Sequence, residues 1–132
     1  MRIVFKLRRK RRYPADRPDV IIAKATDAIL TGKLYLEPAL KCSDVAAKIG
    51  TNRTYLWEAL RVRGFGFQDY LSKFRIRHFI QNAGTFKELR ANEIAEQCGF
   101  NNSKALNKYL KGMMGITLLE YMKRIEKIPL AT

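Results

Sequence analysis

The fold follows from the stretch Val45-Ala46-Ala47-Lys48-Ile49-Gly50, with Asn52, Leu56 and Leu60 after it. The pattern recurs further along as Ile94-Ala95-Glu96-Gln97-Cys98-Gly99, with Asn102, Leu106 and Leu110. Each copy has a small alanine inside a short amphipathic helix, a glycine that can end it and a polar residue that can start the next helix. Two leucines four residues apart then turn one side of the second helix inward. Two helix-turn-helix motifs are predicted, each with one helix face free to enter a DNA groove.

The composition favours a folded protein that binds a polyanion. The chain has 132 residues, of which 47% are hydrophobic, enough for one domain or two small lobes with a core. Lys and Arg number 26 against 12 Asp and Glu, a net charge of +14. Such an excess repels itself in the folded state and is typical of proteins with a polyanionic partner. Nucleic acid is the first partner predicted, and an anionic membrane surface is the alternative.

The residue content excludes several kinds of site. One histidine and two cysteines, Cys42 and Cys98, cannot make a multi-histidine metal site or a zinc finger. We expect both cysteines to be reduced thiols in or beside the core, while a disulfide between them stays open. The chain shows no glycine-rich phosphate loop, no nucleophile–histidine pair and no acidic cluster. We therefore expect no enzyme activity, catalytic residue, metal or cofactor.

A basic segment opens the chain. The run Arg8-Arg9-Lys10-Arg11-Arg12 is followed by Pro14 and Pro18, which is typical of a solvated arm. It could bind phosphate, lie on a membrane surface, join the chain to an upstream part or have no specific role. No apolar stretch approaches the ~18 residues that a membrane span needs, so we expect a soluble, cytoplasmic protein.

Helical periodicity runs through the rest of the chain, and no alternation of apolar residues suggests a strand. The expected fold is all-α. Helices are predicted over 19–30, 44–49, 53–62, 68–82, 92–98 and 103–111, with a last helix opening at Ile116 or Thr117. The first is expected to bury Ile22, Thr26, Ile29 and Leu30. The expected N-caps are Asp19, Ser43 or Asp44, Thr51 or Asn52, and Asn101 or Asn102.

This pattern divides the chain into five segments. We expect a basic arm or linker stub over 1–19, a first helix-turn-helix lobe over 20–66 and a linker helix over 67–84. A second helix-turn-helix lobe follows over 85–124 and a tail over 125–132. The two lobes are expected to be homeodomain-like bundles of three helices joined by the long linker helix.

The stretch 40–123 resembles the DNA-binding domain of AraC/XylS-type transcription factors. The second copy carries most of the resemblance through three runs, Glu93–Phe100, Leu106–Lys111 and Gly115–Tyr121. The linker residues Tyr70-Leu71 and Arg75-Ile76 also fit. The sequence departs from the family pattern at Leu118, Leu110 and Phe79, and its turn Gly64-Phe65-Gly66 is about one residue short. These departures affect packing and the angle between the lobes rather than the fold.

The resemblance implies a bacterial transcription regulator in which two recognition helices enter successive major-groove segments. Double-stranded DNA is the implied partner, with RNA polymerase and an upstream sensor or dimerisation domain left open. No small-molecule ligand is evident. The expected location is the cytoplasm, at the nucleoid, or the inner membrane if the chain is tethered there as part of a longer protein. The alternative function is a protein-interaction module with the same fold and little base-specific reading.

Residues on the outer faces of the two recognition helices are candidates for reading bases. On the first helix, Trp57 could contact a thymine methyl group and Glu58 could accept from cytosine N4. Trp57 could instead be a packing residue, and Glu58 a solvated charge or the ion-pair partner of Arg61. On the second helix, Asn107 could pair with adenine, although an ordinary basic surface helix stays the alternative. The complete base-reading prediction is Thr54, Trp57, Glu58, Ser103, Lys104, Asn107 and Lys108.

Phosphate contacts are expected where helices begin, because free N–H groups and the helix dipole attract anions there. The predicted phosphate contacts are Thr51, Asn52, Arg53, Arg61, Asn101, Asn102 and Lys111. Arg75 and Arg77 on the linker are ambiguous. Arg75 either faces DNA or holds the two lobes together by ion pairing.

Overall fold

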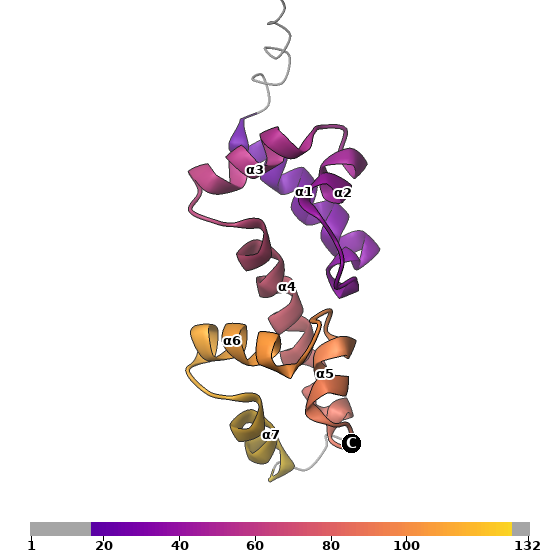
Figure 1. The fold of residues 1–132 in the computed structure, drawn as a ribbon, viewed down its shortest axis with the longest axis vertical. Helices are drawn as coiled ribbons and strands as arrows, with labels where there is room; N and C mark the ends of the chain where they lie inside the picture. The colour runs from indigo at the N-terminus through magenta and orange to yellow at the C-terminus, as the bar shows by residue number, and fades with distance from the viewer. Residues whose placement is uncertain (1–16, 128–132) are drawn as a thin grey trace, which may run out of the picture. The chain divides into compact units, whose positions relative to one another are not determined.

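The computed structural model describes residues 17–127, and every helix or turn of regular structure there is α-helical or 3-10, which confirms the all-α prediction. The run Arg8–Arg12 and residues 128–132 of the expected tail lie outside the described residues. The elements are α1 (Pro18–Gly32), η2 (Leu34–Leu36), α2 (Cys42–Lys48), α3 (Arg53–Val62), α4 (Phe67–Asn82), η3 (Ala83–Phe86), α5 (Ala91–Gln97), α6 (Ser103–Met114) and α7 (Leu118–Glu126) (Figure 1).

The helices form two compact units, here called the first and second lobes. Among the described residues, the first lobe comprises 17–34 and 40–70, and the second comprises 35–39 and 71–127. The boundary falls within α4, between Tyr70 and Leu71. The sequence had placed boundaries at both ends of this helix, because a continuous apolar periodicity does not reveal where its packing partners change.

The first lobe is built around contacts of α1 with α2 and α3. Leu56, Ala59 and Leu60 of α3 are buried, as their spacing predicts. In α1 the predicted stripe is wrong in register. The buried side chains are Ile21, Ala25 and Ile29, whereas Leu30 is 42% exposed. Consecutive apolar residues at 20–22 allow either stripe, so packing against α3 selects the buried one.

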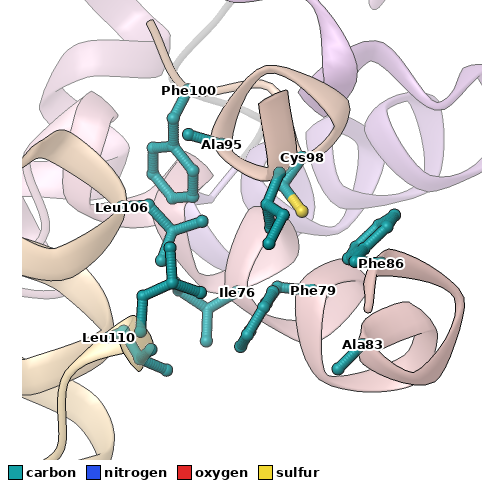
Figure 2. Close-up of a cluster of buried hydrophobic side chains, with 11 residues drawn as sticks. Ile76, Phe79, Ala83, Phe86, Ala95, Cys98, Phe100, Leu106 and Leu110 are labelled. Carbon is teal, nitrogen blue, oxygen red and sulfur yellow. The ribbon is translucent and has the colours of Figure 1, made fainter. Parts of the chain in front are cut away.

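A continuous apolar cluster fills the second lobe (Figure 2). Phe79 is fully buried near its centre, with ring centroids 6.4 Å from Phe86 and 5.0 Å from Tyr121. Leu106 and Leu110 of α6 complete the cluster against α4 and α5 residues. Deletion of a large side chain from such a core costs about 3–5 kcal/mol, so this cluster holds α6 in place.

The two scaffold helices α2 and α5 begin in the same way. A carboxylate three residues into each helix accepts the backbone N–H of the residue before it: Asp44 accepts from Lys41 at 2.9 Å, and Glu93 accepts from Arg90 at 2.8 Å. Ser43 and Asp44 are therefore not N-caps, which corrects the expectation for α2. The acidic residue instead pairs with the otherwise unpaired first N–H from inside the helix.

Two other helix ends differ from expectation. Asp19 is not the N-cap of α1, because the helix starts at Pro18 after Arg17, and the Asp19 carboxylate pairs with Arg63. Helix α6 runs three residues past the predicted end at Lys111. Gly112 stays helical, and Gly115 ends the helix in the left-handed region, with φ of 74° and its N–H donating to Lys111 O at 2.8 Å. The third predicted glycine stop is thus the one that acts.

Both cysteines are buried free thiols. Within residues 17–127 no group of histidine, cysteine and acidic side chains could hold a metal ion. None of the helices in this part of the chain combines the length and apolar character required to traverse a bilayer.

Candidate nucleic-acid interface

The first candidate recognition helix, α3, has one buried side and one exposed side. The Asn52 side chain caps its start, since Oδ1 accepts the Tyr55 N–H at 3.0 Å. Leu56 and Leu60 are fully buried and fix the inner side. Arg53, Thr54 and Arg61 are exposed on the outer side and Trp57 is 42% exposed, while Glu58 is half-buried. The exposed side therefore presents the four predicted base-reading or phosphate residues other than Glu58.

Three outer residues of α3 contact one another. The Arg61 guanidinium donates to Glu58 Oε1 at 2.8 Å and lies with its central carbon 5.5 Å from the Trp57 ring centroid. This is the ion pair that was the alternative for Glu58. Both side chains of the pair are about half exposed, so it adds little stability. It does change the charge that α3 presents, because one arginine faces an internal partner.

The second candidate recognition helix, α6, is fixed by more hydrogen bonds than α3. Asn102 Oδ1 accepts the Ala105 N–H at 2.9 Å, and Asn92 Oδ1 accepts the Ser103 N–H at 2.9 Å. Leu106 and Leu110 are fully buried beneath it. Its first turn is therefore tied both to its own cap and to α5.

The outer side of α6 is uniformly basic. Lys104, Lys108 and Lys111 are exposed, and no acidic residue lies between Ser103 and Met114. Lys108 lies with Nζ 5.2 Å from the Tyr109 ring centroid, which supports its extended stem against the helix surface. By comparison α3 carries Arg53 and Arg61 together with Glu58. The second lobe therefore has the stronger positive face on its recognition helix.

Asn107 differs from the other predicted base-reading residues. Its side chain is half-buried, and Oδ1 accepts the backbone N–H of Leu118, the first residue of α7, at 2.7 Å. Adenine pairing needs this same oxygen to accept from adenine N6. Within the lobe the acceptor is engaged by α7, so we no longer include Asn107 among the residues proposed to read bases.

The predicted phosphate contacts divide in a similar way. Asn52, Asn101 and Asn102 are exposed. In Asn52 and Asn102 the oxygen serves as the cap, which leaves the side-chain NH2 as the donor that a phosphate needs. Thr51 is different, because its hydroxyl oxygen is buried and has no hydrogen-bond partner. We therefore remove Thr51 from the proposed phosphate contacts.

Arg75 has an internal role in the second lobe. It is buried, donates from Nε to Tyr35 O at 2.7 Å and from Nη2 to Glu37 O at 2.9 Å. Burial lowers the pKa of its guanidinium, while Tyr109 and Glu37 act in the opposite direction. The side chain thus binds backbone carbonyls, and the expectation that Arg75 faces DNA is wrong. The exposed Arg77 keeps that possibility on α4.

Two structural residues escaped the sequence analysis. Asn92 and Asn107 each bond to a backbone N–H eleven residues further along the chain. A side-chain amide on a helix carries no periodic signal for such a partner. Only the equivalence of Asn107 with Trp57, five residues after each Asn cap, indicates that the two lobes differ at this position.

Comparisons with known proteins agree with this architecture. The helix-turn-helix domain family matches residues 45–124. One similar solved structure is the C-terminal domain of AraT, a response regulator from Geobacillus stearothermophilus, with 24% identity and a TM-score of 0.61 over 85% of this chain and 90% of that one. Another is the C-terminal domain of the two-component response regulator yesN from Fusobacterium nucleatum, with 27% identity and a TM-score of 0.57 over 76% of this chain and 97% of that one. No curated protein matches the chain significantly.

Proposed function

The chain belongs to the AraC-type helix-turn-helix family of DNA-binding transcription regulators, and on this premise we propose that α3 and α6 read base sequence in successive major-groove segments. The family is not one of enzymes. The observation that carries the proposal is the outer face of α6, where three exposed lysines stand on a helix whose opposite side is anchored by the fully buried Leu106 and Leu110. A rigid basic helix face suits groove insertion.

The proposed contacts follow from exposure and from which polar atoms are unengaged. Lys104 and Lys108 would donate to guanine O6 and N7, and Trp57 would contact a thymine methyl group. Glu58 would accept from cytosine N4 only by releasing Arg61. We propose Thr54, Trp57, Glu58, Ser103, Lys104 and Lys108 as base-reading residues, and Asn52, Arg53, Arg61, Asn101, Asn102 and Lys111 as phosphate contacts.

A selection from a random duplex pool tests sequence reading directly. The full chain should enrich one motif, and its affinity for that motif should exceed its affinity for a scrambled duplex at constant salt. Lys104→Ala and Lys108→Ala should each weaken the selected duplex more than the scrambled one. Lys123→Ala on α7 is the matched control, because it removes the same charge from an exposed position off the recognition helix. Failure to enrich any motif would contradict base reading.

A protein-interaction module with little base reading is the second candidate. The Glu58–Arg61 pair favours it, because that pair weakens the positive face of α3. This function predicts that a regulated reporter in cells keeps its response when Lys104 and Lys108 are both replaced by alanine. DNA-mediated regulation predicts that the response is lost, so the same double variant separates the two candidates.

The regulatory partners are a further part of the proposal. The two similar structures are C-terminal domains of response regulators, which supports control of this chain by a sensor or dimerisation region. At a promoter we propose that the bound protein contacts RNA polymerase and acts at the nucleoid, with inner-membrane tethering as the alternative location. Cross-linking in cells with a photoreactive residue at exposed Leu119 would identify such a partner by its mass.

A further inference from the structure

One position on the recognition helices has opposite surroundings in the two lobes. Trp57 and Asn107 each lie five residues after the Asn that caps their helix, and each directly follows a fully buried leucine. The two residues are therefore equivalent in register. Trp57 is 42% exposed, whereas Asn107 is half-buried and hydrogen-bonded to the next helix.

The helix that follows each recognition helix also begins at equivalent places. Gly64 and Gly115 both have positive φ, and α4 and α7 each start three residues later, at Phe67 and Leu118. In the second lobe the first N–H of α7 has the Asn107 oxygen as its acceptor. A first-turn N–H has no partner within its own helix, so this bond satisfies a group that would otherwise need water.

Trp57 cannot make the equivalent bond. Indole is a donor only, so it offers no acceptor to the Phe67 N–H. Trp57 instead borders a surface hollow of about 510 Å3 that is also lined by Lys41, Arg53 and Gly66. An exposed aromatic surface beside two cations is accessible to a polyanion. The carboxamide of Asn107, by contrast, lines a smaller hollow of about 230 Å3 with apolar residues of α5 and α7, including Ile94, Leu118 and Met122.

We propose that this position contacts DNA in the first lobe and acts within the protein in the second. Trp57 is a specificity-determining contact, and Asn107 is a positioning residue that holds α6 against α7 and reads no base. The inference rests on the proposed function of sequence-specific DNA binding. It implies that the two lobes use different chemistry, an apolar contact from α3 and lysine donors from α6.

The experiment combines amide hydrogen exchange with the random-duplex selection, using the full chain. In Asn107→Ala the protection of the Leu118 N–H should fall about fivefold, the effect of losing a helix cap. Affinity for the selected duplex and for a scrambled duplex should fall by the same factor, and the enriched motif should be unchanged. Trp57→Ala should leave Leu118 protection unchanged and lose the preference for one base pair of the motif.

Asn107→Asp is the second variant, because a carboxylate keeps the acceptor but removes the NH2 donor. Leu118 protection and the motif should both be retained, with affinity lowered equally for all duplexes by the added negative charge. Loss of preference at one A·T pair in either Asn107 variant would overturn the inference. So would an Asn107→Ala protein that is less stable but binds the selected duplex with unchanged affinity, since that is a purely structural role.

The failure of the proposed function gives a different result. In that case the unaltered protein enriches no motif, so the division of base reading between the lobes falls with it. The Leu118 exchange comparison would then report only the hydrogen bond between α6 and α7. A motif that is enriched but loses a base pair in Asn107→Ala would instead leave the proposed function standing and remove this inference alone.

Discussion

The Nε of Arg75 donates to the backbone carbonyl of Tyr35 at 2.7 Å inside the second lobe. Gly99, in the turn between α5 and α6, lies directly against this pair. A methyl group built at Gly99 would lie 2.2 Å from Tyr35 O and 2.9 Å from Arg75 Nε. One buried cation and one glycine thus seat the segment 35–39 beside the turn that leads into the second recognition helix.

Replacement of Arg75 should destabilise the protein through this contact. In Arg75→Lys a single ammonium replaces a planar fork that reaches both Tyr35 O and Glu37 O. We expect the free energy of unfolding to fall by about 2 kcal/mol, the value of a hydrogen bond from a charged group. Urea denaturation measures it. Arg77→Lys, at an exposed position of the same helix, is the control and should stay within about 0.5 kcal/mol. Equal effects at both sites would contradict the role given to Arg75.

The two helix-turn-helix glycines should differ in their tolerance of alanine. Gly50 and Gly99 both have positive φ, 78° and 93°, so each substitution strains the backbone by about 1–2 kcal/mol. Only at Gly99 would the new methyl group also overlap neighbouring atoms. We expect Gly99→Ala to lower the free energy of unfolding by about 3 kcal/mol or more. Gly50→Ala, with nothing within 4 Å, should show the backbone strain alone. A smaller loss at Gly99 than at Gly50 would refute this packing argument.

The Asn caps can be separated from their proposed phosphate contacts. Asn52→Ala should lower stability by about 1 kcal/mol, whereas Asn52→Asp should leave it nearly unchanged because Asp caps as well as Asn. Asp has no NH2 donor and repels phosphate, so Asn52→Asp should still weaken DNA binding. Thermal denaturation and duplex titration provide the two measurements. The same pair of variants at Asn102 repeats the test in the second lobe. Unchanged DNA affinity in both Asp variants would remove these residues from the phosphate contacts.

Salt dependence should reveal the unequal charge of the two recognition helices. Each phosphate contact contributes about 0.9 to the slope of log affinity against log salt. Replacing Lys104, Lys108 and Lys111 by alanine should therefore lower the slope by at most about 2.7. Glu58→Gln should raise it by about 0.9, because Arg61 then loses its partner at 2.8 Å and becomes available to phosphate. A slope that Glu58→Gln leaves unchanged would show that the ion pair does not withhold Arg61 from DNA.

Cys98 should make stability fall in alkaline solution. Burial raises the pKa of its thiol from 9.0 to about 12. The folded state therefore keeps its proton between these values while the unfolded state loses it, so stability is lost as pH rises above about 9. The contribution should reach about 1.4 kcal/mol by pH 10. Urea denaturation at pH 8 and pH 10 would show a smaller loss in Cys98→Ala than in the unaltered protein, whatever the absolute stability of the variant. Identical losses would contradict the pKa shift.

The sequence by itself determined the features that depend on residues within about four positions of each other. Helix α3 begins at Arg53 and ends at Val62 as predicted, because an Asn cap and a leucine pair at helical spacing act within its own turns. The Glu58–Arg61 pair was foreseen as an alternative for the same reason. The matching repeat of caps, glycines and leucines likewise sufficed for the all-α fold and the family.

Tertiary packing decided the rest. Val20, Ile21 and Ile22 are all apolar, so only contact with α3 could select the stripe of Ile21, Ala25 and Ile29. The outward or inward role of Asn107 depended on the N–H of Leu118, which a different helix supplies. A polar side chain on a half-buried helix face takes whichever partner the neighbouring element brings within 3 Å. For that reason equivalent positions in two similar repeats, Trp57 and Asn107, have different surroundings that their own helices do not encode.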